Sequence, residues 1–414
     1  MLCGEVTIMI DNRAVGRCLS EMRKYFRITQ DELAARLSVS RQAVSKWETG
    51  ACIPDIEQLL ALSELFGVTV NDILHGDVTA IRQRRELLLP GETRRDRQVA
   101  VIGAGRWGCF IAWYLDRIGH HVTLVGRPGS QRFGALKSTR CNEYVTLPES
   151  IALTDDETVA LQAEIVVLAI PSQELHALAD RLQSMGVTEK IIVLCMKGIE
   201  VATGRRLTQV ITDALDHSNQ AAVWVGPGHV EEFVRGVPNC MVIDSSSELT
   251  KQEVIRAFSS ELIRFYYGQD LIGSEIGAAA KNVIGIAAGI LDGLDLASLK
   301  GALMSRGTSE ISRLIVAMGG EAASAYGLCH LGDYEATLFS PHSHNRAFGE
   351  AVTRGEPYHA LAEGYATVRA LRNLGKSHGV ELPICEAVYQ VVCEGAKPAG
   401  IIDQLFARSL KNEF

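Results

Sequence analysis

Five apolar runs, separated by segments long enough for helices, constrain the fold of this chain more than any other feature. They lie between residues 98 and 228 and read QVAVIGAG, HVTLVGR, AEIVVLAIP, KIIVLCMKG and AAVWVGPG. Strands with such continuous apolar sequence are typical of a parallel sheet covered by helices on both faces. After about Gly273 the strand pattern ends, and Ala, Leu and Gly recur at helical spacing. We therefore predict an α/β domain over residues 98–272 and an all-α domain over residues 273–414.

A glycine-rich turn follows the first run. Gly103, Gly105 and Gly108 form the pattern G-x-G-x-x-G directly after QVAVI and just before the helical run CFIAWYLDRIG. Such glycines allow a tight turn and bring the backbone close to a pyrophosphate at the helix N-terminus. The pattern predicts a Rossmann-type dinucleotide-binding domain. A purely structural strand-turn-helix connection is the alternative.

The end of the second run indicates which dinucleotide is bound. An NAD-specific site has an acidic residue there for the ribose hydroxyls, whereas this chain has Gly126 followed by Arg127. An arginine at this position can bind a 2′-phosphate. We therefore expect NADP, or use of both NADP and NAD, rather than NAD alone. The alternative is that Arg127 is only a solvated surface charge.

Residues 1–97 differ from the rest of the chain in composition and in the spacing of their apolar residues. Residues 12–76 have helical periodicity with short turn signals, which predicts a compact bundle of about five short helices. A polar, arginine-rich stretch follows, and we interpret residues 77–97 as a basic linker. The expected order is an all-α bundle over residues 1–76, this linker, the α/β domain and the all-α domain.

Within the bundle, the sequence QDELAARLSVSRQAVSKWE predicts two short helices that cross at a steep angle. Thr29 and Ser40 stand where the N-caps of these helices belong. The segment resembles the Cro/C1-type, or XRE-type, repressors over about residues 13–76, including the Arg23 and Glu48 positions that commonly pair in that family. The resemblance implies a helix-turn-helix domain with DNA as its partner.

The second of these helices supplies most of the expected DNA contacts. The candidate DNA-binding residues are Gln30, Arg41, Gln42, Ser45 and Lys46. Side chains of these types suit the major groove, and the stretch around them is locally basic although the formal net charge of the chain is −8. A three-helix protein-interaction bundle is the alternative. Because such domains usually bind two half-sites as a pair, we expect a homodimer.

Several further sequence motifs, from about Gln98 to the C-terminus, resemble those of the NAD(P)-dependent glycerol-3-phosphate dehydrogenases. They are GAGRWG, PSQ, KGIE, EIGAAAKNVIGIAAGILDGL, GLCHLGDYEAT, SHNR, LAEG and ELPICEAVY, in the order found in that family. The resemblance implies reduction of dihydroxyacetone phosphate, a small phosphorylated substrate, to sn-glycerol 3-phosphate. Hydride transfer at C2 requires a general acid beside the substrate oxygen.

The resemblance also implies the residue roles. Lys281 is the expected acid/base, Lys197 and Asn282 orient the carbonyl, and Asp333 and Thr337 hold the substrate hydroxyl and the lysine. Two lysines at one site would lower each other's pKa. The expected substrate-binding set is Lys197, Gly226, Gly228, Lys281, Asn282, Asp333, Thr337, Ser343, His344 and Asn345. The expected cofactor-binding set is Gly103, Gly105, Arg106, Trp107, Gly108, Arg127, Lys197, Val230, His344 and Glu363.

Three residues depart from the family's pattern. His344 replaces the arginine that would clamp the phosphate, and histidine is a weaker clamp because it is only partly charged and offers no bidentate fork. Gly228 removes a substrate-facing hydroxyl, and Arg106 stands where the glycine loop usually has serine. These changes leave two alternatives open: a ligand-sensing transcriptional regulator with a weakly active or inactive dehydrogenase module, and an enzyme for another phosphorylated polyol or 2-hydroxy acid.

Composition narrows the protein class. Hydrophobic residues make up 47% and charged residues 22% of 414 residues, which excludes a disordered chain. The apolar stretch Val283–Leu291 is too short to cross a bilayer, and no signal peptide is evident, so we expect no membrane span and a cytoplasmic location. The cysteine spacing predicts no metal site.

Overall fold

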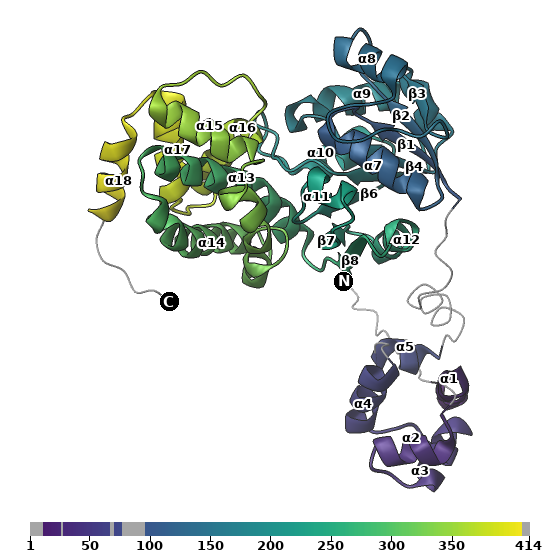
Figure 1. Ribbon diagram of the computed structural model, residues 1–414. Helices are drawn as coiled ribbons and strands as arrows, with labels where there is room; N and C mark the ends of the chain where they lie inside the picture. The colour runs from purple at the N-terminus through teal and green to yellow at the C-terminus, as the bar shows by residue number, and fades with distance from the viewer. Residues whose placement is uncertain (1–10, 26–27, 67–69, 77–95, 408–414) are drawn as a thin grey trace, which may run out of the picture. The chain divides into compact units, whose positions relative to one another are not determined.

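The protein is described by a computed structural model that covers residues 11–25, 28–66, 70–76 and 96–407 (Figure 1). The chain forms two compact units, and the division falls between Glu92 and Thr93. Most of the expected linker, residues 77–95, lies outside the described residues, so the expected domain boundaries stay predictions.

The N-terminal unit is a bundle of short helices, as predicted. Its helices are α1 (Asn12–Tyr25), α2 (Gln30–Arg36), α3 (Arg41–Glu48), α4 (Ile56–Phe66) and α5 (Val70–His75). Thr29 caps α2 in a capping box with Glu32, and the Ser40 hydroxyl accepts a hydrogen bond from the Ala43 amide at the start of α3, so both predicted N-caps are confirmed. Leu33, Val44 and other apolar side chains of the five helices form one buried core.

The second unit begins with a mostly parallel sheet of eight strands in the order β3-β2-β1-β4-β5-β6-β7-β8. The strands are β1 (Gln98–Ile102), β2 (His121–Val125), β3 (Ala152–Thr154), β4 (Ile165–Leu168), β5 (Ile191–Leu194), β6 (Gln220–Val225), β7 (Asn239–Asp244) and β8 (Ile263–Tyr267). The five apolar runs form β1, β2, β4, β5 and β6. The pair β6–β7 is antiparallel and the other neighbours are parallel. Strands β3, β7 and β8 were not predicted: β3 has three residues, the apolar run of β7 spans only residues 240–243, and β8 has exposed residues at three of its five positions.

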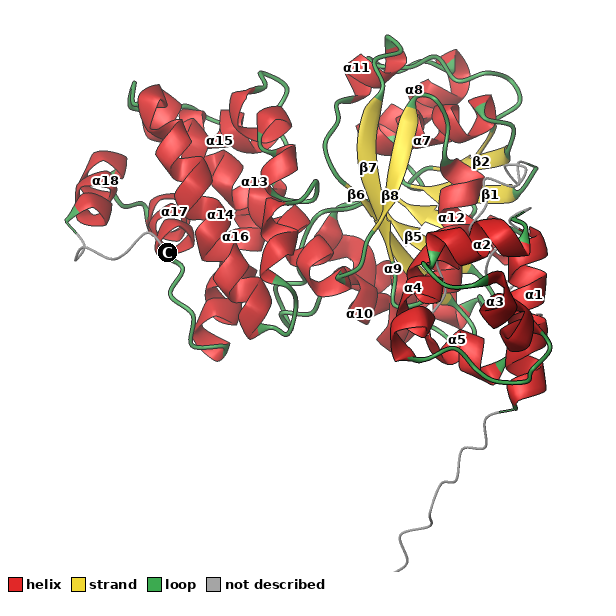
Figure 2. Ribbon diagram, turned by 90° about the horizontal axis from the view of Figure 1, so that it is seen from below, coloured by secondary structure: helices red, strands yellow, loops and turns green. Residues whose placement is uncertain are grey.

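Helices cover both faces of the sheet, as the continuous apolar strands predicted. One face packs against α7 (Arg106–Arg117), α8 (Gln131–Thr139), α11 (Val230–Val234) and α12 (Glu248–Phe258), and the other against α9 (Leu175–Ser184) and α10 (Leu207–Ala214), with the short turns η1 (Glu157–Leu161) and η2 (Ser172–Glu174) in the connections. In Figure 2 the strands lie between α7 and α11 on one side and α9 and α10 on the other.

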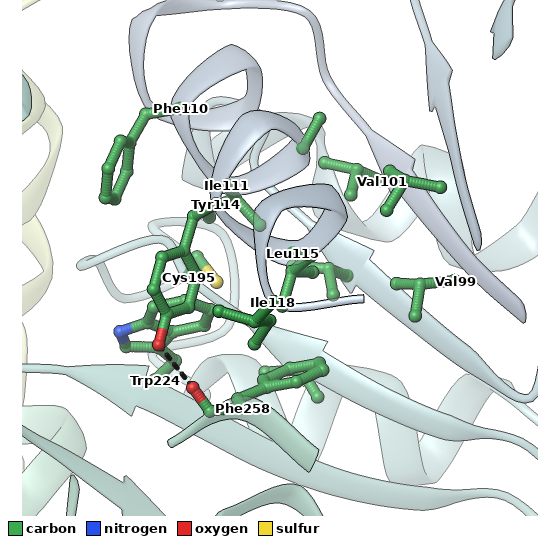
Figure 3. Packing of buried hydrophobic residues seen from close by; sticks show 14 of the residues in the cluster. Val99, Val101, Phe110, Ile111, Tyr114, Leu115, Ile118, Cys195, Trp224 and Phe258 are labelled. Carbon is green, nitrogen blue, oxygen red and sulfur yellow. Dashed lines mark hydrogen bonds between the residues drawn. The ribbon is translucent and has the colours of Figure 1, made fainter. Parts of the chain in front are cut away.

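The first of these cores is rich in aromatic residues (Figure 3). Tyr114 of α7 and Trp224 of β6 are fully buried, with ring centroids 6.0 Å apart in an edge contact. The Tyr114 hydroxyl donates a hydrogen bond to the Phe258 carbonyl at the end of α12. Because a buried hydroxyl is costly without a partner, this bond fixes the C-terminal half of α7 against α12.

The remaining chain is helical, as predicted. Its elements are α13 (Leu271–Gly293), η3 (Ala297–Leu299), α14 (Lys300–Ala317), η4 (Ala322–Tyr326), η5 (Leu331–Asp333), η6 (Glu335–Phe339), α15 (His344–Arg354), α16 (Glu363–Ser377), α17 (Pro383–Glu394) and α18 (Pro398–Phe406). Among the described helices, α13 is the one long and apolar enough to span a membrane, yet 89% of its most apolar window is buried inside the protein. It is the central helix of this domain's core.

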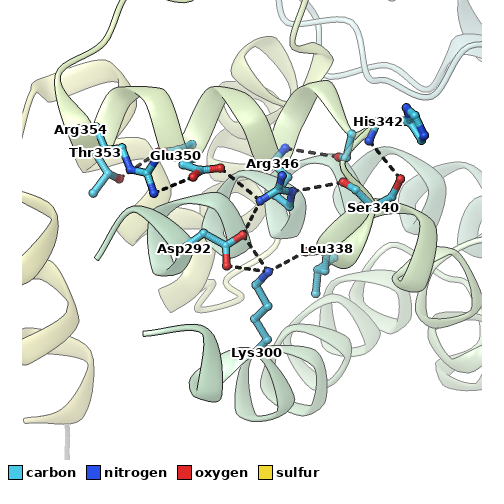
Figure 4. A network of polar contacts seen from close by, with 11 residues as sticks. Asp292, Lys300, Leu338, Ser340, His342, Arg346, Glu350, Thr353 and Arg354 are labelled. Carbon is cyan, nitrogen blue, oxygen red and sulfur yellow. Dashed lines mark hydrogen bonds and ion pairs between the residues drawn. The ribbon is translucent and has the colours of Figure 1, made fainter. Parts of the chain in front are cut away.

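Two glycines allow α13 and α15 to pack with their backbones in contact. A Cβ added at Gly289 would lie 1.9 Å from the Arg346 carbonyl oxygen, and one at Gly349 would lie 2.1 Å from the Ile286 carbonyl oxygen. A polar network fixes the same contact: Arg346 and Lys300 share the Asp292 carboxylate at the end of α13 (Figure 4). The start of α15 is thereby held beside the middle of α13, where Lys281 and Asn282 lie.

Candidate active site

The site is built on the carboxyl ends of β5 and β6, where open α/β sheets bind ligands. Lys197 follows β5, and Gly226 follows β6. The Lys197 ammonium donates a hydrogen bond of 2.6 Å to the Gly226 carbonyl, which joins the two strand ends. The ammonium group is therefore fixed at the edge of the sheet that faces α13.

Two lysines from separate domains meet at one carboxylate oxygen. The Nζ atoms of Lys197 and Lys281 each lie 2.6 Å from Oδ2 of Asp333, and Lys281 Nζ also donates to Oγ1 of Thr337 at 2.9 Å. Lys281 lies in the middle of α13 and is 8% exposed, whereas Asp333 ends η5 and is 1% exposed. The convergence of the two lysines that the resemblance implied is thus present in the fold.

The electrostatics of this cluster favour proton transfer near neutral pH. Burial lowers the pKa of Lys281 to about 7; the Asp333 carboxylate opposes the shift, and the Lys197 ammonium adds to it. Burial therefore outweighs the mutual repulsion of the lysines that we expected to act. A lysine with such a pKa exists in both protonation states at neutral pH, as a general acid/base must.

Irregular backbone places Asp333 and Thr337 against α13. Asp333 ends a 3₁₀ turn, and Thr337 lies in the π-helical turn η6, where its hydroxyl donates to the Asp333 carbonyl at 2.7 Å. The buried His330 ring contacts the Gly277 carbonyl of α13 through Nδ1 and the Tyr334 hydroxyl through Nε2. These bonds stabilise a segment that departs from α-helical geometry. Single π turns of this kind often occur at functional sites.

Amide groups link the lysines to α15 and α16. Asn282 Nδ2 donates to the Lys197 carbonyl, and Asn282 Oδ1 accepts from Asn345, each at 3.0 Å. Asn345 Oδ1 in turn accepts from the Gly364 amide at 2.9 Å. Asn282 therefore fixes the backbone that carries Lys197. The expected substrate residue Ser343 is buried and uses its hydroxyl to cap α15.

The expected cofactor residue Glu363 binds Ser172, a residue without a predicted role. Its two carboxylate oxygens accept hydrogen bonds from the amide and the hydroxyl of Ser172, at 3.2 and 2.6 Å, and burial raises its pKa. Ser172 follows the carboxyl end of β4 and is 1% exposed. The position of PSQ directly after a buried strand was the available signal.

The glycine loop leaves open backbone at the helix N-terminus, which suits a dinucleotide. A Cβ added at Gly105 would meet no atom within 4 Å, and Gly105 begins α7 with no side-chain cap. A Cβ at Gly108 would lie 1.7 Å from the Gly103 carbonyl oxygen. Gly108 therefore serves the helix–strand contact, while Gly105 keeps a space into which pyrophosphate oxygens could reach free amides.

The two glycines should respond differently to alanine. We expect Gly108→Ala to lower the free energy of unfolding by at least about 2 kcal/mol, because overpacked backbone must shift. Gly105→Ala should cost about 1 kcal/mol or less, the price of a weaker cap, and yet weaken NADPH binding by at least about tenfold. Urea titration and nicotinamide fluorescence measure the two quantities. Equal loss of stability in both variants would contradict this division of roles.

The end of β2 explains why no acidic residue stands there. A Cβ at Gly126 would lie 2.1 Å from Cγ of Phe133, a buried residue of α8. Any side chain at this position would therefore displace the ring. Arg127 follows on the surface and is exposed. The expected cofactor residues Trp107 and Val230 lie at the starts of α7 and α11, and the Trp107 ring packs 6.3 Å from that of Phe233.

The three departures from the family pattern each have a local structural partner. Gly228 has a φ of +146°, and a Cβ there would lie 2.4 Å from Phe233, so this backbone excludes the missing hydroxyl. His344 is exposed and contacts the Tyr358 hydroxyl through Nδ1 at 3.0 Å. Arg106 forms an ion pair with Glu231 of α11 and lies over the Tyr144 ring.

The candidate DNA-binding residues lie mostly on one exposed helix. Arg41, Gln42 and Lys46 of α3 are exposed, and Ser45 is partly buried. Gln30 instead donates to Glu48 at 2.8 Å, beside the Arg23–Glu48 ion pair that the repressor resemblance implied.

The fold and site define a class: dehydrogenases in which a Rossmann-type cofactor domain is joined to a helical domain that contributes a buried lysine. Comparison with known proteins makes this specific. Residues 98–251 and 270–403 match the N-terminal and C-terminal family descriptions of NAD-dependent glycerol-3-phosphate dehydrogenase, and residues 19–73 match the helix-turn-helix family. The chain belongs to the NAD-dependent glycerol-3-phosphate dehydrogenase family and has a helix-turn-helix domain at its N-terminus.

Individual relatives agree. The chain is 36% identical over 328 residues to a glycerol-3-phosphate dehydrogenase (NAD(P)+) of Thermoanaerobacter sp. (strain X514), covering 76% of this chain and 98% of the relative. It is 37% identical over 330 residues to that of Chlorobium phaeobacteroides (strain BS1), covering 76% and 99%. The crystal structure of glycerol-3-phosphate dehydrogenase from Coxiella burnetii has a TM-score of 0.71 and 27% identity, covering 76% of this chain and 99% of that one.

Proposed function

We propose that this protein reduces dihydroxyacetone phosphate to sn-glycerol 3-phosphate with NADPH or NADH, and binds specific DNA through its N-terminal unit. The observation that carries the enzymatic proposal is the meeting of Lys197 and Lys281 at Asp333 Oδ2. Family membership indicates the substrate, and the buried Lys281 is the group that would transfer the proton.

When bound, the reduced nicotinamide supplies the hydride that C2 of the substrate accepts. Lys281 in its ammonium form donates a proton to the C2 oxygen as that oxygen gains negative charge, and is left as a neutral amine. The Lys197 side chain stabilises the developing charge. Asp333 and Thr337 hold the Lys281 nitrogen in place during the transfer. In the reverse direction neutral Lys281 removes the hydroxyl proton.

Two features support NADPH or dual cofactor use in this proposal. The end of β2 has no carboxylate to repel a 2′-phosphate, because the Phe133 ring fills the space beside Gly126. The exposed guanidinium of Arg127 follows immediately. Gly103, Gly105 and Gly108 would hold the pyrophosphate against α7.

The test is the oxidation of NADPH and NADH by the purified full-length protein with millimolar dihydroxyacetone phosphate, followed by nicotinamide absorbance, with the product identified by mass. We expect catalytic turnover and a product with the mass of glycerol phosphate. Absence of oxidation with either cofactor would overturn the enzymatic proposal. It would favour a ligand-sensing regulator. In such a regulator the ligand must bind the DNA-binding conformation and the non-binding conformation of the protein with different affinities.

We also propose that the protein acts as a homodimer in the cytoplasm, because helix-turn-helix domains usually bind two half-sites together. Sedimentation of the full chain with and without a DNA duplex measures the stoichiometry. One protomer per bound duplex would contradict the dimer.

A further inference from the structure

A histidine beside the catalytic lysines has a buried polar atom with no partner. His229 follows Gly228 after the carboxyl end of β6 and directly precedes α11. Its Nε2 atom is inaccessible to solvent and makes no hydrogen bond with any described residue. A buried polar atom left unpaired costs about 1–3 kcal/mol, so a fold that retains one often reserves it for a ligand.

Charged groups from three elements surround this ring. The His342 ring lies 5.7 Å away at 62°, and its Nδ1 is 3.6 Å from Oε1 of Glu231. Arg106 of α7 pairs with Glu231 and reaches the His342 carbonyl at 3.5 Å. His229 therefore lies where the cofactor loop, α11 and the segment before α15 come together.

The charges that act on His229 are of both signs, and its two cationic neighbours, Arg106 and Lys281, would attract an anion. Burial lowers the pKa of His229, and the positive charges of Arg106 and Lys281 lower it further, against the opposing effects of Glu232 and Glu231. A lowered pKa favours the neutral form of His229, which has one ring N–H to donate. An incoming anion would supply the missing acceptor for Nε2 and would be attracted by Arg106 and Lys281.

We propose that His229 positions the substrate by donating a hydrogen bond from Nε2 to its phosphate group while Lys281 and Lys197 hold the C2 oxygen. This rests on the proposed function and adds to it the recognition of the phosphate. The ligand is a phosphate monoester rather than the nicotinamide amide, because a neutral amide would gain little from the neighbouring cations. His344 faces Tyr358 and is not the phosphate donor in this assignment.

Two variants separate a hydrogen-bonding role from a packing role. His229→Phe keeps a ring but removes the donor, and we expect the KM for dihydroxyacetone phosphate to rise by at least about tenfold with kcat within about threefold. His229→Gln restores a donor near the same position and should recover most of the KM. His342→Gln, on the neighbouring ring, is the matched control and should change the KM by less than about threefold. Thermal unfolding verifies that each variant folds.

Dihydroxyacetone, which lacks the phosphate, serves as the second substrate. His229→Phe should leave its KM and the Kd for NADPH unchanged. An equal rise in KM for both substrates, a change in cofactor affinity alone, or no effect of His229→Phe would each overturn the proposal.

Calorimetry with sn-glycerol 3-phosphate makes the test independent of turnover. Anion binding should raise the pKa of His229, so wild-type protein should take up protons on binding, detected as a heat that depends on the ionisation enthalpy of the buffer. His229→Gln should bind with reduced proton uptake, and His229→Phe should bind weakly. Binding by wild-type protein without turnover would refute the enzymatic proposal and leave this one standing, whereas wild-type protein that does not bind sn-glycerol 3-phosphate would refute this one.

Discussion

Replacement of Lys281 with methionine should lower kcat for dihydroxyacetone phosphate reduction by about 10²- to 10⁴-fold, the range expected when a general acid is removed. Methionine fills a similar volume but cannot donate a proton. The Kd for NADPH should change little, because Lys281 contacts Asp333 and Thr337 and not the glycine loop. Single-turnover absorbance measurements with saturating substrate would separate the chemical step from binding.

Lys251→Met is the matched control for this experiment. Lys251 is similarly buried, at 7% exposure, but it binds the Gly268 carbonyl and Glu248 at the far edge of the sheet. This variant should lose stability while kcat stays within about threefold. If both lysine variants reduced kcat equally, the loss would reflect general destabilisation and Lys281 would not be the acid.

The second large effect concerns DNA. Arg41→Ala combined with Lys46→Ala should raise the Kd for a duplex selected by the wild-type protein from random-sequence DNA by at least about 100-fold, because contacts from α3 to bases or phosphates are worth about 1–3 kcal/mol each. The Arg41–Asp31 pair is exposed and 3.8 Å long, so its loss should not unfold the bundle. Gel retardation at fixed salt measures the Kd.

Arg13→Ala combined with Arg17→Ala removes the same charge from the exposed side of α1. We expect this control to weaken binding by less than about tenfold, in proportion to a general electrostatic effect. Equal losses in the two double variants would assign the affinity to net charge and not to α3.

Local patterns carried most of what the sequence predicted correctly. The β1–turn–α7 unit was predictable because each requirement lies within a few residues: a buried strand, glycines where backbone or ligand comes close, and an apolar helix. The caps Thr29 and Ser40 were predictable for the same reason. In contrast, β8 has exposed residues at three of its five positions, and the apolar run of β7 spans only residues 240–243 between two polar residues, so neither has the longer apolar run that identified the central strands.

The active site was less accessible to such reasoning, because its geometry is a property of tertiary contacts. The pairing of Lys197 with Lys281 came only from resemblance. Asp333 and Thr337 lie in 3₁₀ and π turns, which do not follow the α-helical period. The low pKa of Lys281 depends mainly on the burial of this α13 side chain in the folded protein, which the sequence of the helix does not show. Nor does any local signal separate His229, with its unpaired Nε2, from an ordinary surface histidine.

The central claim is that Lys281 carries the proton between solvent and the C2 oxygen, and the pH dependence of kcat/KM in both directions tests it most directly. Reduction needs the ammonium, so its kcat/KM should fall as pH rises through about 7; oxidation of sn-glycerol 3-phosphate needs the neutral amine, so its kcat/KM should fall as pH drops through about 7. Ionisation of the substrate phosphate, with a pKa of about 6, would change kcat/KM in the same sense for reduction and oxidation. The opposite bends of the two profiles therefore distinguish Lys281 from the phosphate. Profiles that bend in the same sense, or that show no bend between about pH 6 and 8, would contradict the assignment of Lys281.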